Sequence, residues 1–142
     1  MYINTEPENF SLELIQKIEE KYKAKYICET SIMYNDRNWS ENPSAIFYTE
    51  TPHPEGSNYF AISVGSDGYY IISDALPSIK KMEPIAAVRS GDEVIYSRYR
   101  HDYRTTKDGK VSIDGGRDYV RVCGEEFNSC MLKFENDTLV II

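Results

Sequence analysis

Short runs of alternating apolar and polar residues, separated by turn residues at close spacing, recur through most of this 142-residue chain. This spacing is typical of antiparallel sheets, in which neighbouring strands are joined by tight turns. In the clearest case, residues 58–64 and 69–73 flank the turn Gly65-Ser66-Asp67-Gly68, a pattern that predicts a hairpin. We expect further strands at 26–34, 45–49, 85–88, 93–99, 99–105, 110–114, 118–123, 131–134 and 138–142, and a connector with one helical turn at 75–84.

One long helix is expected near the N-terminus. Thr5-Glu6-Pro7-Glu8 has the form of a capping box with proline in the first turn. An apolar stripe at helical spacing follows, formed by Phe10, Leu14, Ile15, Ile18 and Tyr22. The predicted fold class is therefore α+β, with the N-terminal helix packed on a curled, mainly antiparallel β-sheet or half-barrel. Since no linker divides the chain, residues 1–142 are expected to form a single domain.

The charge of the chain is unevenly distributed. The net charge is −7, yet residues 89–121 contain eight Lys and Arg against six Asp and Glu, and six of the seven arginines lie there. An acidic body disfavours direct nucleic-acid binding, which depends on basic side chains at phosphates. The acidic surface either faces a basic partner or serves only to keep the protein soluble.

The sequence favours a cytoplasmic protein. It has no run of about 20 apolar residues that would span a membrane, and residues 1–8 are acidic, unlike a signal peptide. The three cysteines, Cys28, Cys123 and Cys130, form no C-x-x-C pair, and we expect reduced thiols. Pairing of Cys123 with Cys130 across a hairpin is the alternative.

Candidate binding residues concentrate between Arg98 and Arg121. If residues 94–104 are extended, one strand face presents Arg98, Arg100, Asp102 and Arg104, and the other presents Tyr99, His101 and Tyr103. Guanidinium groups donate forked hydrogen bonds to phosphate or carboxylate. The full candidate site comprises Arg98, Arg100, His101, Asp102, Arg104, Asp114, Arg117, Asp118 and Arg121. The alternative is a set of ordinary cross-strand ion pairs with Asp114-Gly115-Gly116 as a turn.

Two short motifs in this region resemble a known family. Arg100-His101-Asp102-Tyr103, followed by Asp114-Gly115-Gly116-Arg117-Asp118-Tyr119-Val120-Arg121, is similar to an R-H-D-[FY] … D-G-G-x-D-Y-x-R pattern. Small uncharacterised bacterial and phage proteins carry that pattern. The resemblance covers residues 88–124, about a quarter of the chain, and implies no particular activity.

The resemblance also implies a zinc ribbon in many relatives, with cysteine knuckles on both sides of the R-H-D motif. At those positions this chain has Ala87-Val88-Arg89-Ser90-Gly91 and Thr106-Lys107-Asp108-Gly109, so the knuckle glycines are present and the thiolates are not. Zinc needs four nitrogen, sulfur or oxygen ligands, and Asp108 with a serine and a threonine does not supply them. We therefore expect residues 89–124 to form a metal-free, degenerate ribbon whose two turns are held by packing alone, and we expect no cofactor.

Three functions remain open. The first is a non-enzymatic binding protein, for example a phage-encoded inhibitor of a host or defence protein, consistent with the acidic composition and with twelve tyrosines, including Tyr69-Tyr70. The second is a module that sequesters a nucleotide or another phosphorylated small molecule on the arginine face. The third is a hydrolase using His101 with Asp102 or Asp118. The C-terminal run Val140-Ile141-Ile142 either closes a sheet or forms an edge that pairs with a second copy.

Overall fold

A computed structural model describes residues 2–32, 42–65, 68–98, 102–115 and 120–142. The chain divides into two compact units, which are treated separately. The acidic unit comprises residues 5–81 and 135–138, and has seven Lys and Arg against fourteen Asp and Glu. The arginine unit comprises residues 1–4, 82–134 and 139–142, and has nine of each sign. The whole net charge of −7 therefore belongs to the acidic unit.

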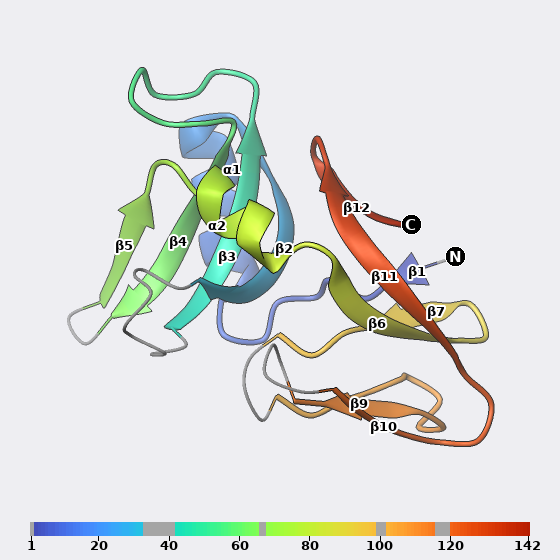
Figure 1. Ribbon diagram of the computed structural model, residues 1–142. Coiled ribbons are helices and arrows are strands. Elements are labelled where there is room, and N and C mark those ends of the chain that lie inside the picture. The colour runs from blue at the N-terminus through green and yellow to red at the C-terminus, as the bar shows by residue number, and fades with distance from the viewer. Residues whose placement is uncertain (1, 33–41, 66–67, 99–101, 116–119) are drawn as a thin grey trace. The chain divides into compact units, whose positions relative to one another are not determined.

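The acidic unit contains a four-stranded antiparallel sheet in the order β2-β3-β4-β5 (Figure 1). Its elements are α1 (Leu12–Tyr22), β2 (Ala24–Ile32), β3 (Asn42–Thr49), β4 (Tyr59–Gly65), β5 (Gly68–Ile72) and α2 (Leu76–Met82), of which Met82 already belongs to the arginine unit. The hairpin predicted at 58–73 is confirmed, with register from Gly65 opposite Gly68 to Ala61 opposite Ile72. The expected connector at 75–84 contains the seven-residue helix α2.

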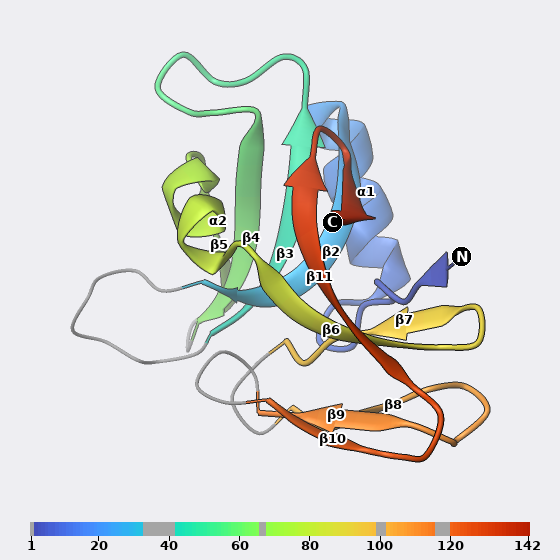
Figure 2. The same cartoon turned by 45° about the vertical axis from the view of Figure 1, so that its right-hand side comes forward.

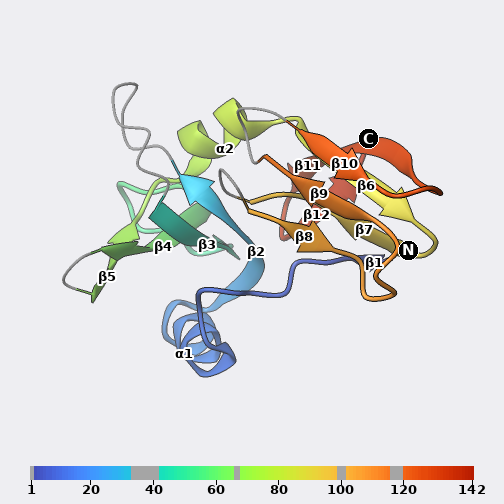
Figure 3. The same cartoon turned by 90° about the horizontal axis from the view of Figure 1, so that it is seen from below.

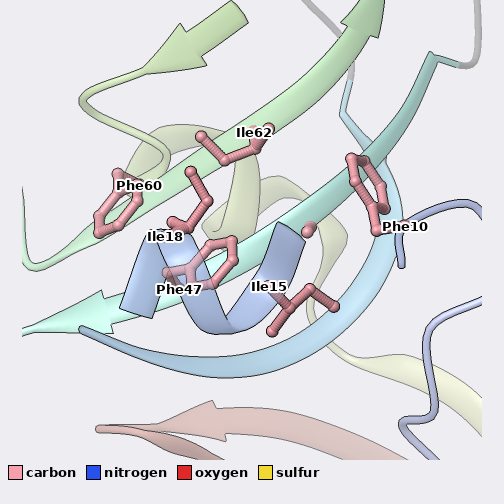
Figure 4. Close-up of a cluster of buried hydrophobic side chains, with 7 residues drawn as sticks. Phe10, Ile15, Ile18, Phe47, Phe60 and Ile62 are labelled. Atoms are coloured by element: carbon pink, nitrogen blue, oxygen red, sulfur yellow. The ribbon is translucent and has the colours of Figure 1, made fainter. Parts of the chain in front are cut away.

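The two helices lie on opposite faces of this sheet (Figure 3). On the α1 face, the side chains of Phe10, Ile15 and Ile18 form one buried cluster with those of β3 and β4, including Phe47 and Phe60 (Figure 4). The Phe47 and Phe60 rings stack with centroids 5.2 Å apart. Among the described residues, no helix combines the length and the apolar character needed to cross a bilayer.

Helix α1 begins later than the sequence predicts. Its N-cap is Ser11, whose hydroxyl accepts a hydrogen bond from Leu14 N at 3.1 Å, so the expected cap at Thr5 is wrong. The reason lies in β2, where the carboxylate of Glu29 is fully buried. This carboxylate accepts hydrogen bonds from the backbone N–H groups of Glu8 and Asn9. Those donors are satisfied by tertiary contact rather than by a capping residue, and the segment before Ser11 is not helical.

The arginine unit contains two sheets, with the orders β1-β7-β6-β11-β12 and β10-β9-β8 (Figure 2). The strands are β1 (Tyr2–Ile3), β6 (Ile85–Ser90), β7 (Glu93–Ile95), β8 (Arg104–Thr105), β9 (Ser112–Asp114), β10 (Arg121–Cys123), β11 (Asn128–Glu135) and β12 (Thr138–Ile141). Residues 135–138, which comprise the end of β11, the turn and the start of β12, belong to the acidic unit. Strand β1, which the sequence did not indicate, pairs in parallel with β7. Among the described residues, strand residues outnumber helical residues, which confirms the expected β-rich class at that coarse level.

All three cysteines are free thiols. Cys28 is buried in β2, Cys123 is exposed on β10, and Cys130 is half-buried on β11. The expected reduced state agrees with this arrangement, and the alternative pairing of Cys123 with Cys130 does not occur.

Candidate functional site

After β7, the described residues on either side of positions 99–101 lie close together. Ser97 Oγ donates a hydrogen bond to the carbonyl oxygen of Asp102 at 2.7 Å, and Arg98 N donates to Asp102 Oδ2 at 2.7 Å. Five extended residues would span roughly 16 Å, so residues 97 and 102 cannot lie on one continuous strand. The prediction that 94–104 is extended, with its arginines on one face, is therefore wrong.

Asp102 organises this loop. Besides the backbone N–H of Arg98, its Oδ2 accepts a hydrogen bond from Arg104 Nε at 3.1 Å, an ion pair in which both side chains are largely buried. A carboxylate with two donors on one oxygen holds both ends of the loop together. Asp102 thus brings Arg98 and Arg104 close together through hydrogen bonds of its own side chain. Strand alternation does not predict this contact.

The Arg98 side chain is almost wholly buried, with 2% of its surface exposed. Its guanidinium carbon lies 5.7 Å from the centre of the Tyr96 ring, within the distance at which a cation interacts with an aromatic face. Tyr96, the residue directly after β7, is also buried. The loop therefore holds a charged group out of bulk water beside an aromatic ring.

A cavity of about 290 Å³ lies against this loop. Its wall includes Asn4, Tyr96, Arg98, Tyr103, Arg104 and Thr105, and no carboxylate side chain among the described residues lines it. The hydroxyl groups of Tyr103 and Thr105 both lie within hydrogen-bond distance of Ser112 Oγ, at 2.8 and 3.0 Å. The positive charge of the wall consequently comes from the two guanidinium groups, which makes the cavity chemically suited to a small anion.

The other predicted site residues lie elsewhere or outside the described residues. Asp114 on β9 and Arg121 on β10 are directly opposite one another in the three-stranded sheet. Asp114 Oδ1 is buried, and no described residue hydrogen-bonds to it. Arg100, His101, Arg117 and Asp118 lie outside the described residues, so the hydrolase hypothesis based on His101 stays a prediction.

The two turns that carry the knuckle glycines are held by hydrogen bonds. Thr106 Oγ1 donates to Asp108 Oδ1 at 2.7 Å, and Lys110 N donates to the same oxygen at 3.0 Å. In the other turn, Ser90 Oγ donates to the carbonyl oxygen of Glu126 at 3.2 Å. The expectation that packing alone holds these turns is therefore wrong. Serine, threonine and aspartate at the knuckle positions bond to the protein itself.

These hydrogen bonds also affect the acidity of Asp108. The Thr106 hydroxyl and then the Lys110 backbone N–H stabilise the charged form and lower the pKa of this exposed carboxyl below its usual value of 3.8. In the described part of the chain, no three His, Cys, Asp or Glu side chains converge in a way that would hold a metal ion.

The sequence did not identify all of the residues around the cavity. Asn4 precedes the loop by about ninety positions and reaches the wall because β1 pairs with β7, where Asn4 Nδ2 donates to Glu93 at 3.1 Å. A two-residue parallel strand carries no periodic signal in the sequence. The sequence predicts Tyr96 only as a strand residue, since nothing local shows that its ring lies beside a guanidinium group.

Comparison with known proteins gives one match. A family model described as Domain of unknown function (DUF7695) matches residues 89–124. This stretch contains the loop, the β8–β9–β10 sheet and both knuckle turns, and it amounts to about a quarter of the chain. The description assigns no activity. Neither a curated protein nor a solved structure matches the chain.

Proposed function

We propose that this chain is a non-enzymatic protein-binding domain that docks its partner along β5, the last strand of the acidic unit's sheet. The observation that carries the proposal is the combination of position and exposure in this strand. No strand of the described chain lies beyond β5 in the sheet order. Its Tyr69 and Ile71 side chains are 55% and 44% exposed, and Tyr70 is exposed as well.

An edge strand of this kind is suited to pairing with another chain. Alternate residues of an edge strand direct backbone N–H and C=O groups away from the sheet, and an added strand can bond to them. Natural sheets commonly protect their edges with lysine, proline or a bulge. β5 reads Gly-Tyr-Tyr-Ile-Ile, with neither residue, and its register with β4 is regular. Exposed tyrosine is moreover enriched at protein interfaces.

The charge of the acidic unit supports a basic protein partner. All of the net charge of −7 belongs to this unit, and a partner with a basic surface would be attracted to it over about a Debye length. Nucleic acid would be repelled. The resemblance of residues 88–124 to bacterial and phage proteins makes a phage-encoded inhibitor of a host or defence protein the form of this function that we favour, acting in the host cytoplasm.

The test is capture from a bacterial lysate with three versions of the tagged chain. Ile71→Lys places a charge on the edge, and Leu12→Lys places the same charge on a side chain that is 66% exposed at the start of α1. We expect the wild type and Leu12→Lys to retain the same protein, and Ile71→Lys to lose it. Recovery by all three versions, or by none at low and high salt, would rule out docking on β5.

A second candidate function is the binding of a small phosphorylated molecule in the cavity beside Arg98 and Arg104. The specific support is the cavity wall, with two guanidinium groups and no carboxylate among its described residues. A ligand present at about 100 times its dissociation constant stabilises the folded state by about 2.7 kcal/mol. A nucleotide panel should therefore raise the melting temperature of the wild type and of the exposed-site control Arg89→Gln, but not that of Arg104→Gln. Absence of any shift removes this candidate.

A further inference from the structure

A second cavity lies in the acidic unit, on the α1 side of the sheet beside β5. Its volume is about 250 Å³, and its apolar walls are formed by Tyr22 at the end of α1, Phe60 on β4 and Ile71 on β5. The loop between β3 and β4 closes one side through Thr51 and His53. The cavity therefore adjoins the same edge strand that carries the proposed function.

The cavity exists because α1 covers only part of the sheet. The helix ends at Tyr22, whose ring centroid lies 5.4 Å from that of Phe60, and Lys23 turns the chain with a φ of 50°. Ile62 on β4 lies inside the cluster under the helix and is 1% exposed. Its direct cross-strand partner Ile71 lies on the same face, beyond the helix, and remains exposed.

Several polar groups of the cavity wall already form hydrogen bonds within the unit. Thr49 Oγ1 donates to the carbonyl oxygens at the end of α1 at 3.3 and 3.4 Å, and it accepts from Thr51 N at 3.1 Å. Ser57 Oγ donates to the Tyr59 carbonyl oxygen at 2.8 Å, and His53 Nδ1 accepts from Glu55 N at 3.2 Å. Because these groups bond to the protein itself, a polar occupant would gain little from them, and an apolar occupant would lose little.

The loop that closes the cavity is also well fixed against the end of β5. Ser57 N donates to the carbonyl oxygen of Ser73 at 3.2 Å, and Gly56 N donates to that of His53 at 2.8 Å. A Cβ atom on Gly56 would lie 2.6 Å from the Ser73 carbonyl oxygen, so only glycine allows the loop to approach this closely. The cavity is thus formed before any partner binds, which reduces the ordering cost of occupying it.

We infer that this cavity receives one apolar side chain of an extended, basic peptide segment that pairs with β5. The inference rests on the proposed function. A strand added beside β5 would lie about 4.8 Å away, and the side chain opposite Ile71 would have its Cβ about 5 Å from that of Ile71, on the α1 face. An apolar cavity of about 150 Å³ holds benzene, so this one has room for a side chain the size of leucine or phenylalanine.

The negative charge of the acidic unit favours a basic peptide over a second copy of this chain as the occupant. Glu50 and Glu55 in the loop and Asp74 after β5 are exposed acidic residues that flank the cavity along the sequence. Lys21 and Lys23 flank Tyr22 on the helix side, yet the unit as a whole carries −7. Two copies meeting at β5 would bring two such units together, whereas lysines beside the apolar residue of a peptide would be attracted.

The experiment uses fluorescein-labelled seven-residue peptides of the pattern Lys-Thr-Lys-Leu-Lys-Thr-Lys and measures fluorescence anisotropy against the full chain. We expect the leucine peptide to bind and the central alanine version to bind on the order of tenfold more weakly, because the buried apolar surface is lost. Exchange of the lysines for glutamates should abolish binding at low salt. In an extended peptide, alternate N–H groups point to opposite edges of the peptide, and only one edge can pair with β5. N-methylation of the nitrogens on that edge should also abolish binding.

The protein variants locate the binding. Thr51→Trp places a large ring in the cavity wall and should remove the difference between the leucine and alanine peptides. Leu12→Trp, on the exposed start of α1, should preserve it. Thermal melting checks that both variants are folded, and the wild-type comparison of leucine with alanine does not depend on either variant.

The outcomes separate this inference from the proposed function. If N-methylation abolishes binding while leucine and alanine bind equally, strand pairing stands and the cavity inference is overturned. If N-methylation on neither edge has an effect, or no peptide binds, the inference and docking on β5 are overturned together. If the wild type sediments as a dimer that Ile71→Lys dissociates, the occupant of the edge is a second copy and the basic peptide is excluded.

Discussion

Ile62 and Ile71 are direct cross-strand partners on β4 and β5 with their side chains on the same face of the sheet, yet Ile62 is 1% exposed and Ile71 is 44% exposed. The difference arises because α1 covers β4 and stops short of β5. One residue of the pair serves the core, and the other is available at the surface.

This contrast predicts unequal losses of stability. Ile62→Ala leaves a cavity in the cluster of α1, β3 and β4 and should lower the free energy of unfolding by about 2–5 kcal/mol. Ile71→Ala removes a surface side chain and should change it by about 0.5 kcal/mol or less. Urea titration followed by circular dichroism measures both. Equal losses would show that β5 is covered in solution.

The position of the α1 cap gives a second prediction. Ser11→Ala removes the hydroxyl that accepts from Leu14 N and should lower the free energy of unfolding by about 1 kcal/mol. Thr5→Ala leaves that bond in place and should have an effect of only a few tenths of a kcal/mol. A larger loss for Thr5→Ala than for Ser11→Ala would instead support the capping box at Thr5 that the sequence predicts.

Glu29→Gln tests the buried carboxylate that binds the segment before α1. The amide keeps one acceptor oxygen but places an NH₂ group among the donors of Glu8 and Asn9, so we expect a loss of about 1–3 kcal/mol. Amide exchange at positions 8 and 9 should accelerate. Glu13→Gln, in an exposed pair with Lys17, is the control and should leave both stability and exchange nearly unchanged.

The stability that the Asp108 turn contributes to the folded state should depend on pH. Its folded-state pKa is lower than the ordinary value of 3.8, so the ionised carboxylate is favoured by folding. The stabilisation by ionised Asp108 is fully present when the pH is above the unfolded-state pKa of this carboxyl. It is lost as the pH falls through the folded-state pKa. NMR titration should place the Asp108 midpoint below 3.8, and Thr106→Val should raise it because the largest cause of the shift is removed. A midpoint that is unchanged by Thr106→Val would contradict the hydrogen bond.

The three thiols should react in a defined order with iodoacetamide. Exposed Cys123 should react first. Cys130 should follow slowly near pH 8, since partial burial raises the pKa of its thiol above 9.0, against a smaller opposing effect of Arg89, and leaves little thiolate. Cys28 should react only on unfolding, because it is fully buried. Mass spectrometry of the digested protein gives the order, and early labelling of Cys28 would contradict its position in β2.

Local sequence patterns predict only part of the candidate site. The concentration of arginine and aspartate between residues 98 and 121 could be found in the sequence, and Arg98 and Arg104 do line one cavity. Their arrangement could not be predicted from strand alternation, because the Asp102 side chain closes a loop through Arg98 N and Arg104 Nε. A hydrogen bond between a side chain and a backbone group several residues away leaves no periodic trace.

The sequence by itself determined the elements whose signals are local. The hairpin of β4 and β5 follows from two alternating runs around a glycine-flanked turn, the stripe of α1 follows from helical spacing, and the acidic balance of residues 5–81 can be counted directly. Only the tertiary structure decided where α1 begins, which of Ile62 and Ile71 is buried, and where cavities remain. Those outcomes depend on contacts between segments far apart in the chain, such as Glu29 with Asn9 or Tyr22 with Phe60, and no local preference of either partner specifies them.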